Sequence, residues 1–355
     1  MMSTHESRSY YYERKKSFSY LASHYRSSFR WIATIFLIIL VLFAVALSIR
    51  FGASDLTYKG IWDALFHYDE TNSAHVILHE LRLPRAIAGL LVGAALAVSG
   101  AIMQGVTRNA LAEPSILGVT AGAGFMLSIA YAVTKAPDFS TLVLFSFIGA
   151  GAGAALVFTL TAIGKGGITP VKLALAGSAI TAMLSALSTT IGLKYDVAKD
   201  ISFWYAGGLS SIQPIHVQVA VPFIVAGLLL AFFLSKSISV MSLGEEVAKG
   251  LGQRTTLIRI LCTIVVLLLT GAAVSIAGII GFVGLVVPHI VRAIVGVDYR
   301  WIIPVSAIVG GCLLLFADIL GRIIMSPFET PVGAITAIIG VPFFLYLARK
   351  DGRGL

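Results

Sequence analysis

The sequence predicts an all-α protein, a polytopic membrane bundle of about ten transmembrane helices with both termini cytoplasmic. The first observation is composition: 57% of the 355 residues are hydrophobic and 12% are charged, against about 45–50% and about 25% in soluble domains. The second is a series of ten apolar runs, each near the length that crosses a bilayer. The third is the placement of Lys and Arg around those runs. Together they exclude an ordinary soluble enzyme and a nucleic-acid-binding chain.

A transmembrane helix needs roughly 20 apolar residues at about 1.5 Å per residue. The seventh and eighth runs form one stretch too long for a single crossing, and we divide it near Gly278 and Gly281, where the backbone can turn. The predicted spans are 31–49, 84–106, 115–133, 141–163, 173–192, 217–235, 257–277, 278–294, 301–320 and 331–347.

The first run allows a second interpretation, because Ala44, Val45 and Ala46 resemble a signal-peptidase site after a hydrophobic core. A signal peptide rarely has 30 polar residues ahead of that core. We therefore expect a retained first helix preceded by a basic cytoplasmic tail, residues 1–30.

Orientation follows from the positive-inside rule. With a cytoplasmic N-terminus and alternating spans, 18 of the 26 Lys and Arg residues lie inside. The four tryptophans support the same boundaries, because each lies at or just beyond a span end, where an amphipathic indole is favoured. They are Trp31, Trp62, Trp204 and Trp301.

The spans contain small residues at one-turn spacing and almost no charge. Glycine pairs such as Gly149 and Gly153 are typical of close helix packing, which we favour over a ligand role. Asp318, Arg259 and Arg292 lie toward span ends, which disfavours an ion-coupled carrier without excluding it. No phosphate-binding loop of the G-x-x-x-x-G-K-[ST] type occurs, so any ATP must be hydrolysed by another subunit.

Two loops contain residues that are unusual for simple connections between spans. Arg82 and Arg85 flank Pro84 on the outer side, against the positive-inside trend, where they suit either lipid headgroups or carboxylates of an external partner. The inner segment 242–252 is too polar to span, and we interpret it as a short amphipathic helix opened by a capping box between Ser242 and Glu245. Its apolar side can rest on headgroups or dock into a soluble partner.

The inner turn 108–118 lies between the second and third spans and by itself predicts only a capped turn, with Pro114 opening the next helix. The chain nevertheless resembles the FecCD family of ABC-importer permeases. The motifs that carry the resemblance are L-R-L-P-R from Leu81, A-L-A-x-S-G-A-I-M-Q, N-A-L-A-E-P-x3-G from Asn109, residues 278–292, and Ala317-Asp318 with Arg322, Pro327, Glu329, Pro331, Val332, Gly333, Gly340 and Pro342.

The resemblance implies a permease domain over residues 31–348, a cytoplasmic tail at 349–355, and a place in the bacterial cytoplasmic membrane. It implies a second permease subunit, two ATPase subunits that bind ATP and Mg²⁺, and an extracytoplasmic binding protein, whereas this chain would bind no cofactor or metal. It makes Arg82, Arg85 and Arg322 the docking arginines for that binding protein. The coupling helix would be formed by Ser242, Leu243, Gly244, Glu245, Glu246, Val247, Ala248, Leu251 and Gly252.

The resemblance places an inner gate at Thr169, Pro170 and Val171, where this sequence lacks the hydroxyl pair of the cobalamin permease. We interpret His289, next to Pro288, as a packing or hinge residue rather than a metal ligand. The expected cargo is an iron-siderophore complex, with haem or cobalamin as alternatives. An ion-coupled secondary carrier and a membrane scaffold stay as competing functions, and only the carrier would transport without ATP.

Overall fold

The computed structural model describes residues 31–51, 57–134, 137–163, 170–325 and 328–351. Among these residues, seven helices are long and apolar enough to cross a membrane, and three shorter apolar helices complete the ten predicted spans. The basic tail 1–30 and most of the C-terminal tail lie outside the described residues. The spanning helices are Trp31–Arg50, α4 (Leu83–Thr107), α5 (Val119–Val133), α6 (Phe139–Ile163), α7 (Pro170–Lys194), α9 (Pro214–Ser242), α11 (Thr255–Ala277), α12 (Val283–Val295), α13 (Tyr299–Ile324) and α14 (Val332–Asp351).

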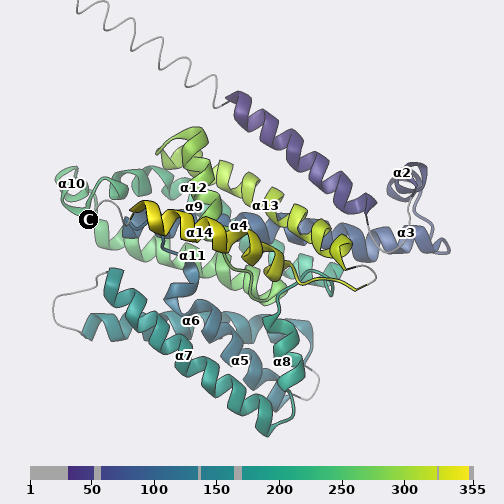
Figure 1. Cartoon of the computed structure of the whole chain (residues 1–355), viewed down its shortest axis with the longest axis horizontal. Coiled ribbons are helices and arrows are strands. Elements are labelled where there is room, and N and C mark those ends of the chain that lie inside the picture. The colour runs from purple at the N-terminus through teal and green to yellow at the C-terminus, as the bar shows by residue number, and fades with distance from the viewer. Residues whose placement is uncertain (1–30, 52–56, 135–136, 164–169, 326–327, 352–355) are drawn as a thin grey trace, which may run out of the picture.

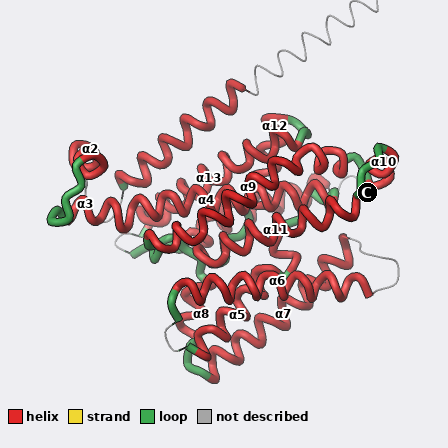
Figure 2. The backbone as a smooth tube through the Cα atoms, turned by 180° about the vertical axis from the view of Figure 1, so that it is seen from behind, coloured by secondary structure: helices red, strands yellow, loops and turns green. Residues whose placement is uncertain are grey.

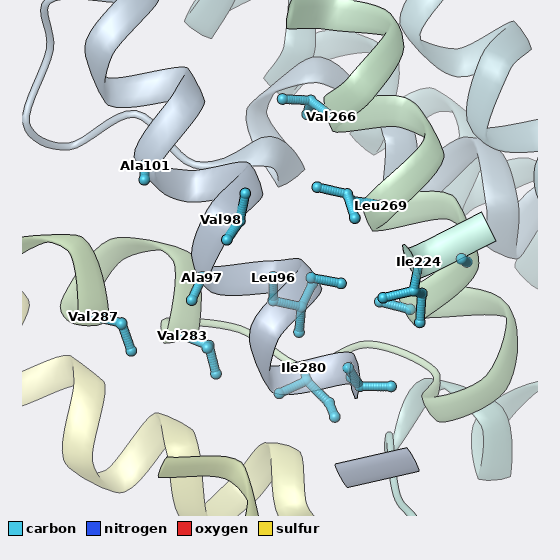
Figure 3. Packing of buried hydrophobic residues seen from close by; sticks show 14 of the residues in the cluster. Leu96, Ala97, Val98, Ala101, Ile224, Val266, Leu269, Ile280, Val283 and Val287 are labelled. Atoms are coloured by element: carbon cyan, nitrogen blue, oxygen red, sulfur yellow. The ribbon is translucent and has the colours of Figure 1, made fainter. Parts of the chain in front are cut away.

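Helix α4 lies at the centre of the bundle, and most of its residues are buried. Figure 3 shows its side chains Leu96, Ala97 and Val98 among residues of α9, α11 and α12. Close approach depends on glycine: a Cβ on Gly93 would lie 2.2 Å from the carbonyl oxygen of Gly310 in α13. This confirms the packing interpretation of the small residues, because helices in lipid associate through such contacts.

Helices α5, α6 and α7 form a second group beside the first, with the short helix α8 (Ala198–Tyr205) at one end (Figure 1). Its seam is again made of glycine, since a Cβ on Gly122 would lie 2.0 Å from the carbonyl oxygen of Gly149. The glycine pairs of α5 and α6 therefore pack against each other.

Two non-helical breaks separate consecutive spanning helices, one between α11 and α12 and one between α4 and α5. Helix α11 ends at Ala277, and Gly278 follows with φ 66° before α12 starts at Val283, which confirms the division predicted there. After α4, a short 3₁₀ helix (Pro114–Leu117) precedes α5. Pro114 therefore opens a 3₁₀ turn, and the α-helix begins five residues later.

Additional short helices lie at the two ends of the bundle. At one end are α2 (Tyr58–Phe66), α3 (Ser73–Ile77) and a π-helical turn (Leu78–Arg82) that continues into α4. At the other end is α10 (Glu245–Gly250), on the side away from α2 and α3 (Figures 1 and 2). The bundle thus has two distinct polar ends, one built around the start of α4 and one around α10.

Candidate functional site

The end of the bundle near α3 contains a buried charge cluster centred on Asp318 of α13. The Asp318 carboxylate is fully buried and accepts hydrogen bonds from Arg85 Nε at 3.1 Å and Arg85 Nη2 at 2.8 Å. Arg322, one turn further along α13, donates to its second oxygen. The cluster therefore joins α4 to α13 through one carboxylate held between two guanidinium groups.

Two further contacts extend this cluster to neighbouring segments. Arg85 Nη1 donates to Glu329 Oε1 at 2.9 Å, and the Glu329 side chain is 40% exposed. Arg322 Nη1 donates to the backbone oxygens of Ser48 and Phe51 at 2.9 Å each. The cluster therefore also fixes the end of the first described helix and the segment before α14.

Arg82 lies at the same end of the bundle and faces a different set of partners. Its Nη1 donates to the backbone oxygens of Ile49 at 2.6 Å and Arg50 at 3.0 Å, and the residue is 5% exposed. The structure therefore gathers the three predicted docking arginines at one end. It also gives them internal partners that sequence reasoning missed, although Asp318 at i, i+4 from Arg322 was a usable signal.

Beside this cluster is a cavity of about 480 Å³ between the two helix groups. Arg85 and Glu329 form part of its wall, with Asp200 and Trp204 of α8 and Phe139 at the start of α6. Phe139 stacks on the ring of His216 with centroids 3.6 Å apart. Charged and aromatic groups therefore line a space of the size that small-molecule pockets have.

The opposite end presents α10. An exposed apolar stripe runs along it and its two flanks, with Val247 in α10 49% exposed and the flanking Leu243 and Leu251 64% and 67% exposed. Glu245 pairs with Lys249 at 2.9 Å and with Arg259 of α11 at 3.0 Å. Hydrogen bonds from these two cations hold the pKa of the Glu245 carboxyl below its usual value. The result is a short helix fixed to the bundle with an unpartnered apolar face.

The capping box predicted for this segment is wrong. Ser242 is the last residue of α9, and its hydroxyl donates to the backbone oxygen of Ser239 at 2.7 Å. Gly244, at φ 124°, precedes α10 instead, a conformation that a residue with a side chain rarely adopts. Gly252 has φ 79°, as expected for a residue that follows a helix end.

The remaining predicted positions are the inner gate and His289. Thr169 lies outside the described residues, whereas Pro170 and Val171 form the start of α7. His289 contacts Arg292 Nη2 through Nδ1 at 3.2 Å and packs edge-on against Phe343. Within the described ranges, no three His, Cys, Asp or Glu side chains gather in a way that could hold a metal ion.

Comparison with known proteins gives consistent results. The profile of the FecCD transport family matches residues 38–350. The chain is 56% identical to the iron(3+)-hydroxamate import permease FhuB of Bacillus subtilis, over 87% of this chain and 80% of that protein. It is 45% identical to the iron-uptake permease FeuB of the same organism, over 87% and 94%, and 36% identical to the hemin permease HmuU of Yersinia pestis, over 89% and 95%.

A solved structure supports the same assignment. A metal-chelate type ABC transporter in an inward-facing conformation superposes with a TM-score of 0.78 at 28% identity, covering 89% of this chain and 98% of that one. The fold and the family profile therefore point to one family. The chain belongs to the FecCD transport family of permeases.

Proposed function

We propose that this chain is the permease subunit of a bacterial ABC importer that moves a ferric hydroxamate siderophore into the cytoplasm. The observation that carries the proposal is the 56% identity to an iron(3+)-hydroxamate permease over most of both chains. The relative that imports hemin is 36% identical, which makes haem the alternative cargo. A siderophore arrives with its iron already chelated, so transport needs a path of weak contacts and no metal site in the chain.

ATP is hydrolysed by partner subunits. The exposed stripe of Leu243, Val247 and Leu251 is the surface on which an ATPase subunit seats, because an unpartnered apolar helix face of this kind suits a groove on a soluble protein. Ion pairs from Glu245 to Lys249 and to Arg259 hold α10 against α11, so a displacement of α10 by the ATPase is transmitted to the bundle.

The binding protein docks at the opposite end, over the Asp318 cluster. Arg85 pairs with both Asp318 and Glu329, and Arg322 pairs with Asp318, so guanidinium groups that can bind the carboxylates of an acidic partner are gathered at this end. Arg85 is the docking contact, since its other ligand Glu329 is 40% exposed and can give way to a partner carboxylate. Asp318 stays in place and keeps the arginines oriented.

A second permease copy or paralogue completes the path, and residues 169–171, at the start of α7, are the inner gate. ATP binding closes the ATPases, α10 moves, and the two permeases alternate between outward- and inward-facing states. Charge pairing sets the rate of binding-protein encounter and is screened by salt. Arg85→Gln should therefore weaken docking in nanodiscs and flatten its salt dependence, and an unchanged salt slope would contradict the docking role.

The cargo is tested by uptake. A host strain that lacks this gene is complemented with the wild-type gene and supplied with ⁵⁵Fe on a trihydroxamate siderophore, with hemin or with cobalamin in parallel. We expect energy-dependent uptake of the hydroxamate complex alone. Restored hemin or cobalamin uptake without hydroxamate uptake would replace the proposed cargo, and uptake by the purified chain without ATP would overturn the ABC mechanism.

A further inference from the structure

The carboxylate of Glu113 lies where neither docking nor ATPase contact uses it. Glu113 ends the turn that follows α4, yet it lines a cavity of about 240 Å³ together with Leu96, near the midpoint of α4. The turn therefore folds back into the bundle instead of staying at its surface. A carboxylate at that depth is costly and calls for a specific partner.

That partner is the break between α11 and α12. Glu113 Oε1 accepts a hydrogen bond from the backbone N–H of Phe282 at 3.0 Å. Phe282 precedes α12 with φ 68°, a left-handed conformation that few residues other than glycine adopt. An acceptor with negative charge is favoured at a helix N-terminus. The bond therefore joins the turn after α4, which comes from the α10 end of the bundle, to the break between α11 and α12, which comes from the α3 end.

The break is packed from several sides, so a shift of Phe282 would be transmitted. A Cβ on Gly340 of α14 would lie 2.2 Å from Phe282 Cβ, and the backbone oxygen of Ile279 lies 2.2 Å from a Cβ built on Gly207. Figure 3 shows Ile280 and Val283 beside Leu96 and Ala97 of α4. Helices α4, α12 and α14 therefore meet at this point.

The turn itself is short and internally bonded. Asn109 Oδ1 accepts from the backbone N–H of Leu111 at 2.9 Å, and the Asn109 backbone oxygen accepts from Ala112 N at 3.1 Å. Its first residue, Arg108, holds φ 52°, and a Cβ on Gly244 would lie 3.2 Å from Arg108 Nη1. The turn thus begins against the N-terminal end of α10 and ends at the α12 break.

The hydrogen bond to Phe282 is not reinforced by an ion pair. Across the described ranges, Glu113 has no Lys, Arg or His nitrogen within ion-pair distance of its carboxylate. Its cavity includes Thr120 and Thr270, and the Thr270 hydroxyl is buried without a partner. The Glu113 carboxylate is thus held by the Phe282 N–H and by a side-chain hydrogen bond with its neighbour Ser115, beside free space. It can therefore leave Phe282 and form that bond again without breaking an ion pair.

We propose that residues 108–113 transmit the movement of α10 to the break between α11 and α12. Glu113 is the positioning residue, because its carboxylate accepts the hydrogen bond from the Phe282 N–H. The inference rests on the proposed function in one respect, namely that an ATPase moves α10. In one state of the transport cycle Glu113 holds the break closed against α4. Movement of α10 pulls the turn, breaks the bond to Phe282 and frees α12 and α14 to rearrange.

The test uses the full complex in nanodiscs and three variants, Glu113→Ala, Glu113→Gln and Glu70→Ala. Glu70 is an exposed carboxylate in the loop before α3 and serves as the control for the alanine substitution. The readout is cargo imported per ATP hydrolysed, because a purely structural defect lowers the amount of complex and leaves this ratio unchanged. Loss of a hydrogen bond worth about 1 kcal/mol predicts that Glu113→Ala lowers the ratio about fivefold. Glu113→Gln keeps an acceptor oxygen and should stay within about twofold of wild type.

A ratio for Glu113→Ala equal to wild type, or an equal loss in both Glu113 variants, would overturn the proposal. If Glu113→Ala fails to assemble, amide exchange of the Phe282 peptide in the wild-type complex decides. Exchange should differ about fivefold between nucleotide-free and ATP-trapped states, and equal protection in both states refutes the release. Absence of hydroxamate import by wild type would refute the proposed cargo alone, since the exchange measurement does not depend on it.

Discussion

Removal of the Asp318 charge tests the buried cluster most directly. In Asp318→Asn the two guanidinium groups of Arg85 and Arg322 lose their shared counter-ion, and their side chains are only 13% and 6% exposed. Glu329 can compensate Arg85 in part, whereas Arg322 keeps only backbone and hydroxyl oxygens, among them the Ser48 carbonyl. Breaking a buried pair by removing one partner costs about 3–5 kcal/mol, and we expect a loss of that size.

The assay is unfolding of the purified chain in mixed micelles, followed by tryptophan fluorescence. Asp298→Asn is the matched control, because its carboxylate pairs with an exposed arginine and such pairs contribute little. The pair Asp318→Asn with Arg322→Gln should recover part of the loss, since one uncompensated charge is removed. A loss below about 1 kcal/mol for Asp318→Asn, or strict additivity in the double variant, would refute the assignment of a buried ionic clamp.

Three further predictions concern other parts of the chain. Gly100→Val should cost more than about 3 kcal/mol, because its Cβ would lie 1.9 Å from a backbone oxygen of α12, whereas Gly151→Ala meets no atom within 4 Å and should be neutral in the same unfolding assay. Leu243→Asp should abolish ATPase copurification while leaving the bundle folded by thermal unfolding, and retained copurification would argue against the seat on α10. The lowered pKa of Glu245, caused first by Lys249, implies that its stabilisation of α10 is complete above the ordinary carboxyl pKa of about 4.3. This stabilisation should be lost as the pH falls through the lowered pKa that Glu245 has in the folded protein. Amide exchange of α10, corrected for intrinsic rates, should therefore rise only in that pH range, and the rise should be absent in Glu245→Gln.

Hydropathy predicted the spans well, because crossing about 30 Å of hydrocarbon imposes a length and a composition that each segment carries by itself. The division after Ala277 was also predictable, since Gly278 marks a point where the backbone can leave the helix. The helices α2, α3 and α8 were missed. They are too short to cross the bilayer, so the search for apolar runs that placed the spans gives no signal for them.

The sequence predicted where the functional residues lie in the bundle, but not which groups surround them. The motifs placed Arg82, Arg85 and Arg322 at one end of the bundle, but their hydrogen bonds to Ile49, Asp318 and Ser48 depend on helices that meet only in three dimensions. The capping box failed for a related reason. A Ser at i and a Glu at i+3 satisfy the pattern, yet α9 continues through Ser242 because its core face still packs.

The shortness of α12 has a consequence for how the chain enters the membrane during synthesis. Thirteen residues rise about 20 Å, which is less than the hydrocarbon thickness, and Arg292 near the end adds a cost of insertion. The segment cannot therefore be recognised and released into lipid as an independent span. It is stabilised in the membrane only once it packs on α4, which has been inserted earlier in synthesis. Insertion of this part of the protein therefore depends on helices already in the bilayer rather than on recognition of α12 as an independent span.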